Sequence, residues 1–176
     1  MTFGGEVKNE LCRAGLSRKC CAQAEAYGVL LYCNTFCGSE IRIVTEHEAF
    51  AQRLPALFRK AFRLSFDRLP EGEGKRVFSI QAPDKLRLIH QTYGVDPEAL
   101  ALHINFAALE EPCCRAAFFR GAFLSGGVAS SYITACLLPD ETFSVGFASP
   151  DGTHKFDEPT SAGELSPKLG IQNYLN

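Results

Sequence analysis

The cysteines are the residues of this sequence whose type and spacing could carry chemistry. Eight of the 176 residues are cysteine, and two adjacent pairs, Cys20-Cys21 and Cys113-Cys114, lie 93 positions apart. Thiolates are zinc ligands and catalytic nucleophiles, and both roles depend on where the sulfur atoms point. The elements that carry the two pairs therefore decide what these thiols can do.

A zinc site formed by the first cysteine pair with Cys33 and Cys37 has no support in the spacing. Adjacent residues of a helix point about 100° apart, so neighbouring cysteines rarely serve one tetrahedral ion. A cysteine nucleophile would need a positioned histidine, and no local signature accompanies His47, His90, His103 or His154. We expect these thiols to pack as small buried side chains, without a metal or a catalytic role.

The composition favours a globular protein and argues against a secreted protein, a membrane protein and a strongly basic nucleic-acid binder. A hydrophobic content of 46% can build a sizeable core, and the net charge of -2 with a pI of about 6.1 lacks the basic footprint of an independent nucleic-acid binder. Charged residues near the N-terminus argue against a secretion signal, and no apolar stretch approaches the roughly 18 residues of a membrane span. We predict a soluble cytoplasmic protein with free thiols, and glycine patterns predict no nucleotide or other cofactor.

The first 110 residues predict an α+β order of helices and strands. Apolar periodicity, alternation and turn residues predict the following elements. They are a helix over Phe3–Leu11, a helix over Cys20–Cys33, a strand over Glu40–Val44, a helix over Phe50–Phe62, a hairpin of Leu64–Leu69 with Lys75–Ala82, a helix from Asp84 to Tyr93, and a helix from Asp96 to Leu109. Pro55 should kink or split the helix that contains it, and Arg53, Arg59, Lys60 and Arg63 should form its basic outer side.

The two cysteine pairs belong to an internal repeat. At the same offset Ala24 aligns with Ala117, Gly28 with Gly121 and Leu31 with Leu124. A glycine inside a helix costs roughly 1 kcal/mol relative to alanine, so two at equivalent positions need a packing reason. Close approach of two helix backbones at Gly28 and Gly121 supplies that reason, and chance similarity between two alanine-rich helices is the alternative.

Part of the chain resembles a known family. Residues Phe119–Gly127 resemble a degenerate form of the nine-residue LAGLIDADG motif of homing endonucleases. Together with Phe3, Glu6, Val7, Lys8, Glu10, Leu11 and Cys113–Arg115, they resemble the WhiA family of bacterial sporulation and cell-division regulators. The resemblance covers about the first 127 residues, and it implies two motif helices side by side with curved strands that form a saddle over DNA.

The resemblance also implies that metal-dependent DNA cleavage is lost. Active nucleases of this type hold a divalent ion with an acidic residue at the eighth motif position of each helix, and Cys33 and Gly126 stand at those positions here. Neither glycine nor a lone thiol replaces a pair of hard carboxylate ligands for Mg²⁺. We therefore predict that the protein is not an enzyme.

Four residues are candidates for DNA contact if the predicted sheet faces DNA. Alternation places Arg42 with Lys75, Ser79 and Gln81 on the outer face, opposite Ile41, Ile43, Phe78 and Ile80. The alternative is an ordinary solvated strand face, which the lack of net positive charge favours.

The resemblance predicts an incomplete second half. We predict a helical arm over residues 1–18, a first LAGLIDADG-like half over 19–110, the second motif helix over 111–127 and a divergent tail over 128–176, where a hairpin from Tyr132 to Phe147 could form. WhiA-like chains continue into a helix-turn-helix domain that is not recognisable here, and we interpret the chain as a truncated or frameshifted member.

Three functions follow from these expectations. The first is a DNA-associated regulator of the WhiA type, acting in transcription, cell division or sporulation without catalysis. The second is a module for protein interaction or dimerisation without DNA binding, and the third is a residual metal-dependent nuclease. DNA is the predicted partner, proteins are the alternative partners, and no membrane partner is expected.

Overall fold

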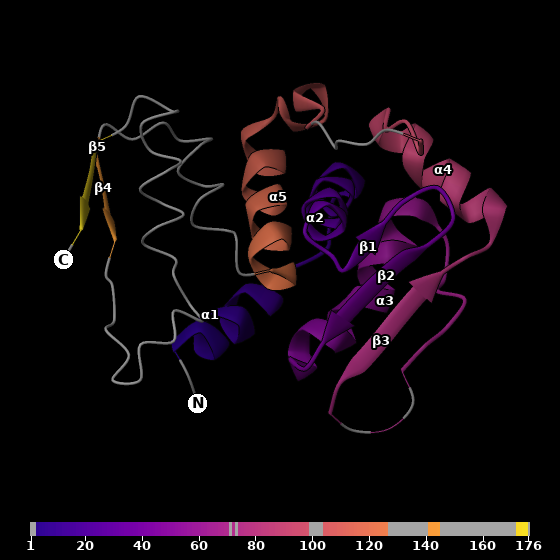
Figure 1. Cartoon of the computed structure of the whole chain (residues 1–176), viewed down its shortest axis with the longest axis horizontal. Coiled ribbons are helices and arrows are strands. Elements are labelled where there is room, and N and C mark those ends of the chain that lie inside the picture. Colours follow the sequence, from indigo (N-terminus) through magenta and orange to yellow (C-terminus); the bar gives the residue numbers. More distant parts are fainter. Residues whose placement is uncertain are drawn as a thin grey trace. The chain divides into compact units, whose positions relative to one another are not determined.

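The computed structural model describes residues 3–70, 72, 74–98, 104–126, 141–144 and 172–175, and the chain divides into two compact units, Met1–Gly127 and Val128–Asn176. The first unit combines helices with a three-stranded antiparallel sheet, which confirms the predicted α+β class (Figure 1). Its elements are α1 (Phe3–Cys12), α2 (Lys19–Leu31), β1 (Thr35–Phe36), β2 (Ile41–Thr45), α3 (Glu48–Phe62), β3 (Arg76–Ile80), α4 (Pro83–Tyr93), the 3-10 helix η1 (Phe106–Leu109) and α5 (Pro112–Ser125).

The helices predicted from apolar periodicity are present. α1, α2, α3 and α4 confirm four of them, with ends that differ by a few residues from the prediction. α4 begins with Pro83 in its first turn and is followed by Gly94, whose φ of 64° is the left-handed conformation that glycine adopts without cost. Local signals at both ends therefore fix this helix.

Pro55 does not split α3, which corrects the stronger form of that prediction. The helix runs unbroken from Glu48 to Phe62, although proline removes one backbone donor. Leu54 and Leu57 on either side of Pro55 are fully buried, so core packing outweighs the lost hydrogen bond. The His47 side chain caps the first turn by accepting from the Phe50 N–H at 3.2 Å.

The sheet has the order β1-β2-β3, and its register separates a core face from an outer face. Ile41 pairs with Ile80 and Ile43 pairs with Phe78, and all four are buried. The predicted hairpin is only partly formed, because its first arm makes a single bridge between Arg68 and Ser79 instead of a strand. Leu64 and Phe66 of that arm turn into the core, which takes the segment out of the sheet.

The helix predicted from Asp96 to Leu109 is wrong over the residues that are described. Asp96 Oδ1 accepts from the Glu98 N–H at 3.0 Å, and Asn105 Oδ1 accepts from the Ala107 N–H at 3.1 Å at the start of η1. Aspartate and asparagine side chains compete with the helix for backbone donors and so favour turns. Residues 99–103 lie outside the described part of the chain.

The core of the first unit is centred on α2. Residues from Ala24 to Leu30 are all buried, and Tyr27 stacks on Tyr93 of α4 with ring centroids 4.2 Å apart. Phe118 of α5 contacts the Tyr27 ring edge-on, with ring centroids 5.6 Å apart. α5 and α2 lie side by side (Figure 1), so α2 is enclosed by the sheet, α3, α4 and α5.

In the second unit, β4 (Glu141–Ser144) pairs in parallel with β5 (Gln172–Leu175). The predicted hairpin from Tyr132 to Phe147 otherwise lies outside the described residues, and the described partner of β4 is not part of that hairpin. Among the described helices of the chain, none has the length and apolar character that crossing a membrane requires.

Candidate functional site

α2 and α5 form the most extensive contact between described helices, and the two repeated glycines lie in this contact. A Cβ atom on Gly28 would overlap the carbonyl oxygen of Phe118 and stand 2.7 Å from the Ala122 nitrogen. A Cβ atom on Gly121 would overlap the carbonyl oxygen of Glu25 and stand 2.9 Å from its carbon. Only glycine lets the two backbones approach in this way.

The two helices run parallel, with like ends together. Ser125 Oγ near the end of α5 donates to the Val29 carbonyl at 2.9 Å, and a Cβ atom on Gly126 would lie 3.3 Å from the Cβ atom of Tyr32. These contacts follow the same order along both helices as the glycine contacts. The C-terminal ends are therefore adjacent, and so are the N-terminal ends.

Cys33 and Gly126, the residues predicted at the acid positions, lie at the C-terminal ends of the helix pair. The Cys33 thiol donates to the carbonyl oxygens of Leu30 and Thr35 at 3.1 and 3.0 Å. Burial raises the pKa of Cys33 to about 12, so this thiol stays protonated at neutral pH. Gly126 offers no side chain, and neither residue supplies an oxygen ligand.

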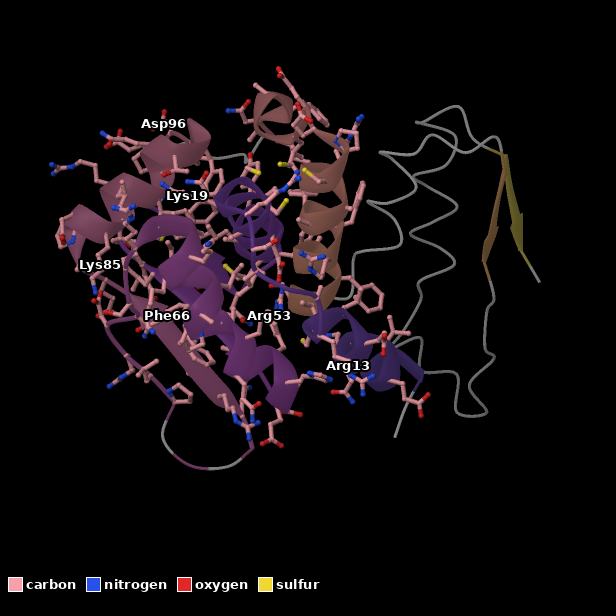
Figure 2. All side chains as sticks on the ribbon, turned by 180° about the vertical axis from the view of Figure 1, so that it is seen from behind. Arg13, Lys19, Arg53, Phe66, Lys85 and Asp96 are labelled. Carbon is pink, nitrogen blue, oxygen red and sulfur yellow. The ribbon has the colours of Figure 1, made fainter. Side chains whose placement is uncertain are left out.

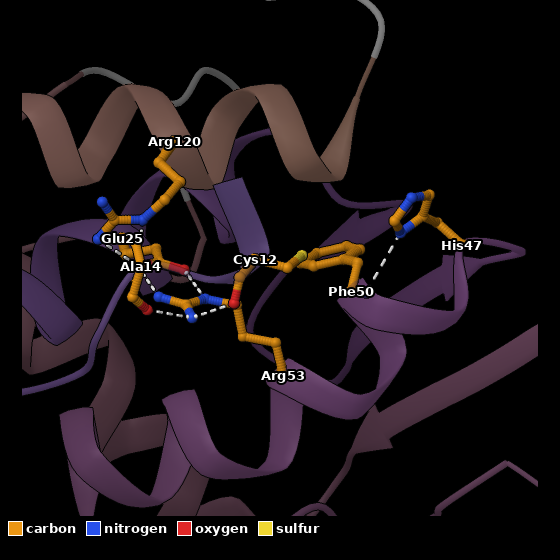
Figure 3. A network of polar contacts seen from close by, with 7 residues as sticks. All are labelled: Cys12, Ala14, Glu25, His47, Phe50, Arg53 and Arg120. Atoms are coloured by element: carbon orange, nitrogen blue, oxygen red, sulfur yellow. Dashed lines mark hydrogen bonds and ion pairs between the residues drawn. The ribbon is translucent and has the colours of Figure 1, made fainter. Parts of the chain in front are cut away.

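A buried carboxylate links four segments of the unit. Glu25 is fully buried and accepts from Arg53 Nε at 2.6 Å and Arg53 Nη2 at 2.9 Å, while Arg120 of α5 approaches the same carboxylate at 2.7 Å (Figure 3). Arg53 Nη1 also donates to the carbonyls of Cys12 and Ala14. The group ties the segment after α1 to α2, α3 and α5.

The burial of Arg53 corrects the prediction that it belongs to the basic outer side of α3. Arg53 is 8% exposed, whereas Arg59, Lys60 and Arg63 are exposed as expected. Figure 2 shows Arg53 within the body of the unit and Arg13 at its surface. Charge periodicity could not reveal Glu25 as its partner, because the two residues belong to different helices.

Three of the four candidate DNA residues are exposed. Arg42, Lys75 and Gln81 are accessible, and Gln81 Nε2 donates to Glu40 Oε1 at 3.1 Å. Ser79 pairs with Arg42 as the alternation predicts but is only 5% exposed, because the Arg68 segment bridges to it. The expectation that Ser79 is accessible on the outer face is therefore wrong.

An open depression of about 690 Å³ lies between the β2 end of the sheet and the end of α5. Lys8, His47 and Lys75 contribute its basic side chains, and Glu46 is the acidic one. Lys8 Nζ donates to the Leu124 carbonyl at 3.2 Å, so α1 reaches the C-terminal end of α5.

The two repeated cysteine pairs come together in the structure. The Sγ atoms of Cys20, Cys21, Cys113 and Cys114 all lie within 4.8 Å of one another, at the N-terminal ends of α2 and α5. Cys33 and Cys37, the partners considered from sequence spacing, are not in this group. The offset of the repeat contained the signal, since parallel helices in register bring equivalent residues together.

Comparison with known families gives one partial match. The sequence model of asparagine synthase matches residues 111–175. This segment is less than half of the chain and falls largely outside the described residues, so the match does not assign the chain to that family. No solved structure matches the chain.

Curated relatives give a consistent result. The probable cell division protein WhiA of Ruminiclostridium cellulolyticum is 35% identical over 141 residues, which cover 74% of this chain and 45% of the relative. The proteins of the same name from Brevibacillus brevis and Alkaliphilus oremlandii are 29% and 26% identical, over 75% and 88% of this chain and 46% and 51% of the relatives.

The chain thus spans about half the length of the curated relatives that it matches. The match to the Alkaliphilus protein covers 88% of the chain, more than residues 1–127 can supply. The expectation that the resemblance ends at Gly127 is therefore wrong for this relative. The sequence matches, all to proteins of one name, show that the chain belongs to the WhiA family.

Proposed function

We propose that the chain is a non-catalytic, DNA-associated regulator of the WhiA type, acting through transcription in cell division and sporulation. The printed names of its relatives support the cell-division part of this proposal. The parallel α2–α5 pair, with one glycine of each helix at the contact, supports a LAGLIDADG-like core. The proposed absence of catalysis rests on one observation: Cys33 and Gly126 supply no carboxylate at the positions where an active nuclease would hold its metal ion.

Cleavage of DNA by such a core would need oxygen ligands at the C-terminal ends of the helix pair. Mg²⁺ takes carboxylate and water oxygens in near-octahedral geometry. Cys33 is a protonated thiol already engaged with two carbonyl groups, and Gly126 has no side chain. These two positions cannot hold a hard ion, so binding without cleavage is the activity that remains.

The outer face of the sheet is the proposed DNA surface. Arg42 and Lys75 would contact phosphates, and Gln81 is a polar neighbour within reach of the groove. Ser79 is not part of this proposed surface, because it is buried. Glu40 lies beside Gln81, so the face is of mixed charge, and the expected binding is weak and strongly dependent on salt.

Fluorescence anisotropy with random duplex DNA at a series of salt concentrations tests the proposal. Each lost phosphate contact reduces the slope of log K against log salt by about 0.9, so the Arg42→Ala/Lys75→Ala variant should lose a slope of about 2. Lys60→Ala, an exposed change on α3, is the matched control and should leave the slope unchanged.

Two results would refute the proposal. Wild-type chain without salt-dependent binding would refute DNA association and favour the protein-interaction module. Nicking of plasmid DNA in the presence of Mg²⁺, abolished by a chelator, would refute the absence of catalysis.

A further inference from the structure

The N-terminal ends of α2 and α5 form a compact cluster of sulfur atoms. Cys20 and Cys21 lie in the first turn of α2, and Cys113 and Cys114 lie in the first turn of α5. The glycine contact holds these turns side by side, and the sulfur atoms, yellow in Figure 2, gather beside them. A pair of adjacent cysteines cannot enclose an ion, but two pairs from parallel helices can.

The spacing of the four sulfurs suits one tetrahedral ion. Zinc binds thiolate sulfur at about 2.3 Å, which places the four sulfurs of a regular tetrahedron about 3.8 Å apart. The Sγ atoms here lie within 4.8 Å of one another, so rotations of the side chains that move each sulfur by less than about 1 Å close the site. An iron–sulfur cluster would hold its cysteine sulfurs farther apart than a single ion does.

The donor set decides the class of metal. All four candidate ligands are thiols, and no carboxylate or imidazole belongs to the cluster among the residues that the structure describes. A tetrahedral set of four soft ligands selects zinc over hard ions such as Mg²⁺ or Ca²⁺. We propose that Cys20, Cys21, Cys113 and Cys114 form a zinc site that clamps α2 to α5.

The surroundings of the cluster are suited to its charge. Zinc with four thiolates carries a net charge of -2, and the N-termini of two helices point their partial positive charges toward it. Arg18 Nη1 approaches Cys113 Sγ at 3.8 Å, and Lys19 and Arg115 are exposed next to the cysteines. Glu110 and Glu111, just before α5, are the nearby acids in the sequence, and both are exposed.

Burial favours the protonated form of two of the four thiols when no metal is bound. It raises the pKa of Cys21 to about 11 and that of Cys114 to about 12. A coordinated thiol is deprotonated, so each of these groups would release its proton to solvent when zinc binds. Cys20 is exposed, so a zinc ion can reach the cluster from solvent on that side. Cys114 is buried, so the opposite side of the cluster is shielded from water.

The zinc clamp would stabilise the folded protein against unfolding. It would join two segments 93 residues apart in the sequence, in addition to the glycine contact further along the same helices. A cross-link that closes a long loop removes much of the entropy of the unfolded chain. This inference does not depend on DNA binding, and the two can fail separately.

Metal loading of the full chain tests the proposal. The reduced, metal-free protein should bind one equivalent of Zn²⁺, and Co²⁺ in its place should give the intense visible bands of a tetrahedral thiolate site. Alkylation with iodoacetamide, followed by mass spectrometry, should find Cys20, Cys21, Cys113 and Cys114 protected by zinc. Cys37 is outside the cluster and should stay reactive.

Two variants separate metal binding from general effects on folding. Cys20→Ser/Cys113→Ser changes one ligand from each helix and leaves the buried Cys114 in place. This variant should lose the bound equivalent and the cobalt spectrum while it keeps the far-UV circular dichroism of the wild type. Cys37→Ser, the matched control, should retain both. Absence of bound metal in the reduced wild type, retention of metal by the double variant, or a disulfide between the two pairs in place of metal would overturn the proposal.

Discussion

Replacement of Gly121 by alanine is the sharpest test of the helix pair. A Cβ atom at this position would overlap the carbonyl oxygen of Glu25 and stand 3.1 Å from the Val29 nitrogen. Both neighbours are backbone atoms of a buried helix, so neither can turn aside as a side chain would. The methyl group can be accommodated only if α2 and α5 move apart.

The expected cost follows from two opposing terms. Alanine favours a helix over glycine by about 1 kcal/mol, which would stabilise the variant. Overpacking of a core costs about 1 to 3 kcal/mol, and a clash with backbone belongs at the upper end of this range. The separation would also strain the contact between Glu25 and Arg120, which crosses from α2 to α5. We therefore expect a net loss of about 2 kcal/mol or more.

Urea unfolding, followed by circular dichroism, measures this loss. With a slope of about 2 kcal/mol per M, the midpoint of Gly121→Ala should fall by about 1 M. Gly28→Ala faces the equivalent backbone atoms of α5 and should lose a similar amount. Gly4→Ala is the matched control, because it lies in α1 with open space around it and should be neutral or slightly stabilising. A Gly121→Ala midpoint at or above the wild-type value would refute the close contact.

Other perturbations test single groups. Glu25→Gln leaves the buried Arg53 guanidinium and the half-buried Arg120 guanidinium without a carboxylate, and it should lower the free energy of unfolding by about 3 to 5 kcal/mol. The exposed control Glu10→Gln should change the free energy of unfolding by less than about 1 kcal/mol, and equal effects of the two variants in urea would contradict the buried network. Hydrogen bonds, that from Lys85 first, lower the pKa of Asp67 from 3.8 to about 2. Its stabilising contribution should therefore be present above about pH 4 and be lost as the pH falls toward 2, and unfolding of Asp67→Asn should lack this dependence. A hydrogen bond from the Cys21 thiol lowers the pKa of Cys113, and burial raises that of Cys114 to about 12. Iodoacetamide should therefore label Cys113 faster than Cys114 in the metal-free protein, and equal rates for the two in peptide mapping would contradict this.

Local signals predicted the elements that local physics controls. The apolar periodicity of α3 and the proline and glycine at the ends of α4 act within a few residues, and both helices formed where expected. The predictions that were wrong concern segments whose structure depends on tertiary packing. The burial of Leu54 and Leu57 stabilises α3 as one continuous helix through Pro55. Phe66 is buried in the core and does not join the sheet in which alternation had placed it.

The site residues show the same division. Alternation placed Arg42 and Ser79 in one register, but it could not reveal that the Arg68 segment covers Ser79. Helical periodicity treats an arginine as a surface residue, so the burial of Arg53 required knowledge of Glu25. Prediction of the four-thiol cluster required the repeat, the parallel direction and the close contact together, since each cysteine pair alone supplies only two of the four sulfur atoms.

One electrostatic cause connects the features at the two ends of the helix pair. Parallel neighbouring helices place like partial charges together, positive at the N-termini and negative at the C-termini, which is unfavourable unless other groups compensate. Lys8 donates to the Leu124 carbonyl at the negative end of α5. The four thiols lie at the positive ends, where the partial charges of the helices favour an anionic zinc–thiolate group. Removal of the zinc would therefore expose the repulsion between the helix N-termini, and the metal-free chain should loosen first at the turns that carry the cysteines, which hydrogen exchange of their backbone amides would detect.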